Sequence, residues 1–325
     1  MRLPAIKTIR TVVVFALAAV GLAAAGPTAT AAPIAINLCA KPGTATLTGA
    51  VTTPIWGFGV PTTPGNCATA TASLPGPQLV VNEGDTVTIN VTNALPAAHT
   101  VSFEIPGIDF AAGSSDAAVG ATVTRTFTAS SPGTYLYQSG GDAGRQEAMG
   151  LSGALIVRSA TANQAYDTAT TAYNVEAVLV LSAVDLNFNA SPDAFDMHGY
   201  LPTYWLINGK SYPDTAPGIT ATPGQKVLLR YLNAGYDNTT MTLLGMHERV
   251  LARSAHLLAN PFDANAETLP AGATEDAIAT VPAGTPPSAN GYPLYNRQLH
   301  LTNGPQTAPG PTPATGGGML TFIHP

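Results

Sequence analysis

The residues best suited to chemistry lie between positions 132 and 157, where two strand-like runs flank a loop interrupted by glycines. Residues 133–137 and 154–157 have the aromatic and β-branched composition of strands, so the segment predicts a hairpin. Its loop contains Asp142, Arg145 and Glu147, which could form a polar site, although loop charges are more often simply solvated. The run 150–154 misses the G-x-S-x-G nucleophile motif at Ala154, so we expect no serine nucleophile.

Cys39 and Cys67 are the two cysteines of the chain, and both precede the first clear pair of strands. In an exported protein, an even pair of cysteines most simply forms a disulfide. The alternative, a copper thiolate, is disfavoured because neither cysteine lies near a histidine in the sequence. We therefore expect a Cys39–Cys67 disulfide.

Residues 1–31 have the pattern of a secretory signal: a basic start, an apolar stretch and an Ala-x-Ala cleavage site at 29–31. Removing its three basic residues leaves ten of the 13 in the chain against 19 acidic ones, a formal charge of −9. An acidic chain argues against a nucleic-acid partner. No other stretch is long and apolar enough to span a bilayer, so we expect a secreted protein without a membrane anchor.

Alternation of apolar and polar residues predicts half-buried strands, as in residues 84–93 and 224–233. These two segments share the spacing of Gly, Val and Asn, residues 133–137 are echoed at 291–295, and residues 153–155 at 318–320. Such a repeat, in 325 residues that exceed the usual size of one core, predicts two tandem all-β domains. The polar segment 159–171 marks their boundary, which gives domains at 32–160 and 161–325.

Several motifs together resemble the multicopper oxidase and copper nitrite reductase family, which is built from cupredoxin (plastocyanin-like) domains. They are Leu-Pro-Gly-Pro at 74–77, His-Thr-Val-Ser-Phe at 99–103, the hairpin with its Met-Gly-Leu-Ser-Gly run from 149, Leu-Ile-Asn-Gly-Lys at 206–210 and Asn-Ala-Gly at 233–235. The resemblance implies two tandem Greek-key β-sandwiches of cupredoxin type. It also implies a copper-dependent oxidoreductase that would oxidise phenols or metal ions with dioxygen.

At most of the positions where the resemblance implies a copper ligand, this chain has a residue of another type. Among the implied ligand positions, His99 and Met149 keep a ligand type, whereas Glu104, Ser139 and Gly144 stand where His, Cys and His are implied. No two histidines are two residues apart, so the His-x-His pairs that bind a trinuclear copper cluster in this family are missing.

Three functions therefore remain open from the sequence. The chain could be a copper-dependent oxidoreductase, a non-catalytic secreted cupredoxin-repeat module with a binding or structural role, or a weak copper-binding protein. In the last case, His99 and Met149 are the residual copper ligands, and a thioether with one imidazole favours Cu(I). Otherwise His99 caps a strand end and Met149 fills a gap in the core. No catalytic residue is assigned, and the sequence identifies no small-molecule or protein partner.

Overall fold

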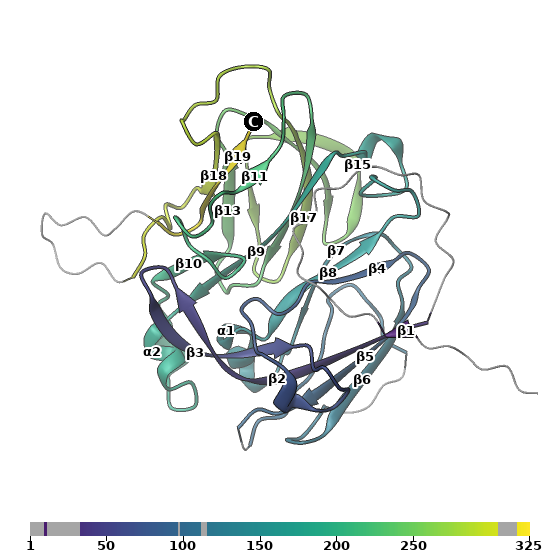
Figure 1. Ribbon diagram of the computed structural model, residues 1–325, viewed down its shortest axis with the longest axis vertical. Coiled ribbons are helices and arrows are strands. Elements are labelled where there is room, and N and C mark those ends of the chain that lie inside the picture. The colour runs from purple at the N-terminus through teal and green to yellow at the C-terminus, as the bar shows by residue number, and fades with distance from the viewer. Residues whose placement is uncertain (1–9, 12–32, 97, 112–115, 305–316) are drawn as a thin grey trace, which may run out of the picture.

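The computed structural model describes residues 10–11, 33–96, 98–111, 116–304 and 317–325, which form four β-sheets and a few short helices (Figure 1). The prediction of an all-β protein is confirmed. The predicted signal at 1–31 lies almost entirely outside the described residues. Within the described ranges, no helix is long and apolar enough to cross a membrane.

Two sheets are built from the strands before residue 159, in the lower part of Figure 1. The larger has the order β1-β2-β5-β6, with β3 also paired to β2, and the smaller has the order β4-β8-β7. The bounds are β1 Arg10–Thr11, β2 Pro33–Leu47, β3 Val51–Gly59, β4 Leu79–Asn82, β5 Thr86–Asn93, β6 Thr122–Thr128, β7 Gly133–Gln138 and β8 Ser152–Arg158.

Two further sheets contain the strands from residue 175 onward, in the upper part of Figure 1. Their orders are β10-β9-β12-β17-β14-β15 and β11-β19-β18-β13-β16. The bounds are β9 Val175–Val184, β10 Tyr204–Ile207, β11 Ile219–Thr220, β12 Lys226–Asn233, β13 Thr239–Leu243, β14 Glu248–Arg253, β15 His256–Ala264, β16 Ala266–Leu269, β17 Thr274–Thr280, β18 Tyr292–Asn296 and β19 Leu320–His324.

The helices are short and lie in the connections. They are α1 Arg145–Met149, α2 Leu186–Ala190 and the 3₁₀ turns η1 Cys67–Thr69, η2 Asp142–Gly144, η3 Ala169–Thr171 and η4 Met197–Gly199. The predicted disulfide is confirmed: Cys39 on β2 is bonded to Cys67 at the start of η1, with the two Cα atoms 5.5 Å apart.

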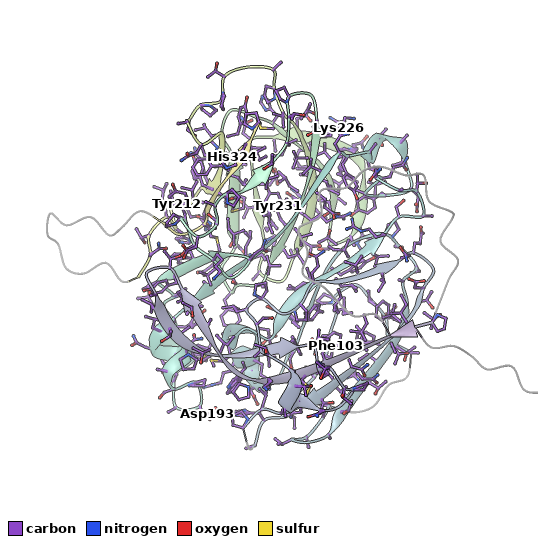
Figure 2. All side chains as sticks on the ribbon, viewed as in Figure 1. Phe103, Asp193, Tyr212, Lys226, Tyr231 and His324 are labelled. Atoms are coloured by element: carbon purple, nitrogen blue, oxygen red, sulfur yellow. A yellow bond between two sulfur atoms is a disulfide. The ribbon has the colours of Figure 1, made fainter. Side chains whose placement is uncertain are left out.

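Each pair of sheets encloses its own hydrophobic core, because alternate residues of a strand point to the same side. In β5, Val87, Ile89 and Val91 are buried in the first core, which also contains Phe103. In β12, Val227, Leu229 and Tyr231 are buried in the second core. Phe103 and Tyr231 mark the two cores in Figure 2.

Strand β7 is buried on both faces because it lies between the two cores. Tyr135 and Tyr137 point into the first core, whereas Leu136 packs with Leu232 of β12 in a small separate cluster. On the same side as Leu136, the Thr134 hydroxyl donates to Asp276 Oδ1 of β17 at 2.5 Å. The two halves of the molecule are therefore joined by apolar and polar contacts, and the division at residue 160 remains a prediction.

The segment 159–171 is less exposed than its polar composition indicates. Ala165 and Tyr166 are buried against Leu228 and Leu251 of the second half. The Tyr166 hydroxyl donates to Asp276 Oδ2 at 2.6 Å. The polar composition of the segment therefore does not make it exposed throughout, because Tyr166 is buried and its hydroxyl has a buried acceptor.

Candidate functional site

The predicted hairpin is present, and its two strands pair in antiparallel register from Gly133 opposite Val157 to Gln138 opposite Ser152. The sequence missed the helix α1 that fills much of its loop. Gly150 ends this helix in the left-handed conformation that glycine favours, with φ 112°. The loop before the helix is tight: a Cβ at Gly141 would lie 2.5 Å from Gln146 Nε2.

Both ring nitrogens of His99 face carboxylates. Its Nδ1 lies 2.7 Å from Asp142 Oδ2, and its Nε2 lies 3.1 Å from Asp193 Oδ1. The ring also packs on Trp56, with centroids 4.6 Å apart. Each ring nitrogen thus has a carboxylate oxygen in the place that a metal ion would occupy.

Ser139, at the implied cysteine position, is fully buried and belongs to the same hydrogen-bond network. Its hydroxyl donates to Gln146 Oε1 at 2.6 Å and accepts from the Ser102 amide at 3.2 Å. The Gln146 amide nitrogen donates in turn to Asp142 Oδ2 at 2.7 Å and to the Thr100 carbonyl at 2.8 Å. A continuous chain of hydrogen bonds therefore runs from Ser139 to His99.

Arg145 of α1 positions the second carboxylate indirectly. Its Nε donates to the Pro192 carbonyl at 3.1 Å and its Nη2 donates to the Phe195 carbonyl at 2.9 Å. Asp193 lies in the loop between these two residues, at the lower edge of the view in Figure 2. The interpretation of the hairpin charges as merely solvated is therefore wrong, because Asp142 and Arg145 have defined partners.

Met149 is the last residue of α1 and is buried in the first core. The remaining implied positions offer little to a metal: Gly144 has no side chain, and Glu104 is exposed. In the part of the chain that the structure describes, no three His, Cys, Asp or Glu side chains are grouped so that they could hold one metal ion. Asp142 and Asp193 approach different nitrogens of one ring, so they lie on separate sides of it.

These residues do not fit a blue-copper centre. Such a centre requires a thiolate and two imidazoles with free nitrogens. Here the hydroxyl of Ser139 is bonded to Gln146, both nitrogens of His99 are engaged, and the two cysteines are bridged. The arrangement at this position is a satisfied polar network rather than an open ligand set.

Glu147, in the same hairpin loop, has a strongly shifted pKa. Burial raises its pKa to about 7, and the nearby Glu104 contributes to the rise. Its Oε1 accepts a long hydrogen bond from Gln138 at 3.4 Å, while its buried Oε2 has no protein partner. From the sequence one could predict only that a carboxylate is present at position 147. Its burial could not be predicted, because it depends on residues from the other half of the chain.

The chain is similar to known proteins in both sequence and structure. Residues 60–162 match the model of a multicopper oxidase domain. The chain is 29% identical over 237 residues to a copper-containing nitrite reductase of Alcaligenes xylosoxydans xylosoxydans, covering 65% of this chain and 70% of that protein.

Several solved structures share the fold. The blue copper oxidase of Nitrosomonas europaea superimposes with a TM-score of 0.71 at 22% identity, covering 90% of this chain and 86% of the other. The multicopper oxidase mgLAC gives a TM-score of 0.71 at 20% identity with the same coverage, and the copper nitrite reductase of Nitrosomonas europaea gives 0.66 at 18% identity, covering 90% and 93%. The predicted fold class, tandem cupredoxin-type sandwiches, is confirmed.

Proposed function

We propose that this chain, whose residues 60–162 match the model of a multicopper oxidase domain and whose fold is that of the cupredoxins, works as an exported, metal-free binding module and not as an oxidase. The observation that carries the proposal is the pair of carboxylates on His99, at 2.7 Å and 3.1 Å from its two nitrogens. For copper to bind to this ring, at least one of these contacts must break.

The energetics of the network favour the same conclusion. A buried polar group without a partner costs about 1–3 kcal/mol, whereas Ser139 and Gln146 satisfy one another and the surrounding backbone. Replacing these contacts by a metal would require new ligands, and closed metal sites use three or four. Only the buried thioether of Met149 remains, as a soft ligand without an ionised partner.

Export rests on two observations. The sequence pattern at 1–31 is that of a secretory signal, and disulfides such as Cys39–Cys67 persist in oxidising compartments. Mass analysis of the protein recovered from culture medium tests this: loss of about the first 31 residues is the expected result. A full-length chain retained in the cell would contradict it.

The central experiment is a metal analysis of protein purified in the presence of copper, with the absorption spectrum and oxygen consumption with a phenol measured on the same sample. We expect substoichiometric copper, no intense blue band because both cysteines are bridged, and no oxygen uptake. One copper per chain or phenol-dependent oxygen uptake would overturn the proposal.

The metal analysis also distinguishes our proposal from the alternative of a weak copper-binding protein. If His99 and Met149 held Cu(I), the parent protein would bind it, and His99→Ala and Met149→Leu would each abolish binding while leaving the protein folded. Our proposal expects no Cu(I) binding by the parent protein, so that neither substitution changes its copper content.

A further inference from the structure

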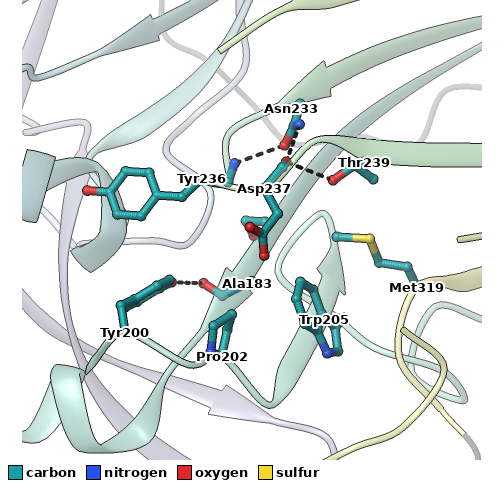
Figure 3. Close-up of a pocket in the computed structure, with 11 residues that line it drawn as sticks. Ala183, Tyr200, Pro202, Trp205, Asn233, Tyr236, Asp237, Thr239 and Met319 are labelled. Atoms are coloured by element: carbon teal, nitrogen blue, oxygen red, sulfur yellow. Dashed lines mark hydrogen bonds between the residues drawn. The ribbon is translucent and has the colours of Figure 1, made fainter. Parts of the chain in front are cut away.

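The hollow shown in Figure 3 is too small for an organic ligand. It lies between Tyr200, Trp205 and Asp237 and has a volume of about 10 Å³, which is roughly the space of one water molecule. A different feature of the chain, a dipeptide that occurs three times, supports a reaction of the chain itself.

Asparagine is followed by glycine at Asn208–Gly209, Asn290–Gly291 and Asn303–Gly304. The three glycines have φ of 74°, 100° and 84°, so each is needed for a backbone conformation that other residues rarely adopt. The same dipeptide is chemically labile. A glycine has no side chain to keep its backbone nitrogen away from the Cγ of the preceding asparagine, so the asparagine amide can be lost.

The reaction is an attack within the chain. The glycine nitrogen loses its proton to base and forms a bond to Cγ of the asparagine, while the bond from Cγ to Nδ2 breaks and ammonia leaves. Water then opens the resulting five-membered succinimide at either carbonyl and gives aspartate or isoaspartate. The net change converts an amide and water into a carboxylic acid and ammonia. Solvent is the co-reactant, and the rate depends on how freely the two groups can approach each other.

The side chain of Asn208 is held at both of its polar atoms. Its Oδ1 accepts from the Val180 amide at 2.8 Å, and its Nδ2 donates to the Val178 carbonyl at 2.8 Å. Gly209 also packs closely against the backbone carbonyl of Leu74. Ring closure at Asn208 therefore requires two hydrogen bonds to strand β9 to break.

Asn303 is held in the same way. Its Oδ1 accepts from the Gly318 amide at 2.9 Å, and its Nδ2 donates to the Tyr212 carbonyl at 2.9 Å. The attacking nitrogen is engaged as well, because the Gly304 amide donates to the Thr203 carbonyl at 3.1 Å. Ring closure at Asn303 therefore requires three hydrogen bonds to break.

Asn290 differs because its side chain is exposed and has no hydrogen bond to any residue that the structure describes. The surrounding turn is closed by Ser288. The Gly291 amide donates to the Ser288 carbonyl at 3.1 Å, and the Ser288 hydroxyl donates to the Gly291 carbonyl at 2.8 Å. The Asn290 amide donates to the same hydroxyl oxygen at 3.2 Å. Only the turn therefore restrains the attack, since the amide that leaves is free to rotate.

We propose that Asn290 is a deamidation site of the folded protein, that the turn closed by Ser288 limits its rate, and that hydrogen bonds protect Asn208 and Asn303. Either product adds a negative charge at the turn that leads into β18, and isoaspartate also lengthens the backbone by one carbon atom. The reaction does not involve copper, so its failure would leave the proposed function untouched.

The test follows the three asparagines in one sample. The folded protein is incubated in mildly alkaline buffer, digested, and analysed by mass spectrometry with chromatographic separation of the aspartate and isoaspartate peptides. We expect Asn290 to convert at least roughly tenfold faster than Asn208 or Asn303, because the latter must break the hydrogen bonds of their side chains. After reduction and unfolding in urea, the three rates should agree within about threefold, because the dipeptide is the same and the fold is absent.

A substitution tests the turn. Ser288→Ala removes two of its hydrogen bonds and should speed the conversion of Asn290 several-fold. Ser130→Ala, the same change at an exposed serine of the first half, is the control and should leave the rate unchanged. Chemical denaturation verifies that both variants fold, and the comparison of the three asparagines in the parent protein needs neither variant.

Two results would overturn the assignment of Asn290: similar rates at the three sites in the folded protein, or conversion of Asn290 in urea but not in the folded protein. An equal rate in Ser288→Ala and the parent protein would overturn the role of the turn.

Discussion

Glu248 is an acid enclosed in the second half of the molecule, where it accepts a hydrogen bond from the Tyr231 hydroxyl at 2.9 Å. Burial raises its pKa to about 8, and the neighbouring Glu275 and Glu267 contribute to the rise. The pKa of Glu275 is also raised by burial, to about 7, although Arg253 lies 3.1 Å from its Oε2. At neutral pH the folded protein therefore holds protons that these carboxyls would release on unfolding.

The direction of the pH dependence follows from these pKa values. Both folded-state values exceed the ordinary value of 4.5, so the folded state binds more protons and its stability falls as pH rises from about 4.5 through 8. We expect the free energy of unfolding, measured by urea denaturation, to drop by a few kcal/mol between pH 5 and 9. Glu248→Gln keeps the acceptor for Tyr231 and should flatten much of this slope. An equal slope in parent and variant would contradict the assignment.

At the scale of elements, β7 is held against β12 and β17 by a buried charge network. Arg230 of β12 lies 2.7 Å from Glu176 Oε1 and 3.2 Å from Asp276 Oδ2, and its Nη1 donates to Thr134 of β7 at 3.0 Å. Burial by itself would lower the pKa of Arg230, but Asp276 and Glu176 outweigh it and raise the pKa. Arg230 therefore stays charged, and the carboxylates of Glu176 and Asp276 are needed to compensate its buried charge.

Removing Arg230 takes away the positive charge that lies beside the buried carboxylate of Asp276. We expect Arg230→Met to destabilise the protein by about 3–5 kcal/mol in urea denaturation, because an uncompensated buried charge is costly. Arg249→Met is the matched control: its partner Asp263 is 60% exposed, and the loss should be below about 1 kcal/mol. Equal effects of the two substitutions would show that the network contributes little.

At the scale of the whole molecule, two cores are joined through β7 and through Tyr166 in the connecting segment. The segment is exposed at residues 160–163 and again at Asp167, Ala169 and Thr170, whereas Ala165, Tyr166 and Thr171 are buried. Only part of the connecting segment is therefore accessible. A protease can cleave the rest of it only after the hydrogen bond between Tyr166 and Asp276 has broken.

Limited proteolysis is expected to cut the connecting segment first, at residues 160–163, because exposed backbone between two cores is the usual site of nicking. Mass analysis of the first fragments gives the position. Tyr166→Phe removes the hydroxyl bond to Asp276 and should widen the cleavage towards residues 164–170. First cuts within a strand of either core would show that the proposed domain division is wrong.

Local properties of the chain made much of the architecture predictable. Alternating residues identified β5 and β12 because the side-chain period of a strand is two, and each segment then forms one wall of a core. The hairpin of β7 and β8 was visible from its composition and glycines. The Cys39–Cys67 bond was predictable because the chain has two cysteines and a sequence pattern that predicts export.

Tertiary structure alone decided the chemistry of the sites. Asp193 reaches His99 because Arg145 holds its loop, and Thr134 reaches Asp276 across 142 residues of sequence. Burial, which raises the pKa of Glu147 to about 7 and encloses the Ser182 hydroxyl, depends on the packing of one half against the other. The sequence determined which side chains were present and which strands carried them. Hydrogen-bond partners and desolvation are set by residues far along the chain, which no local pattern specifies.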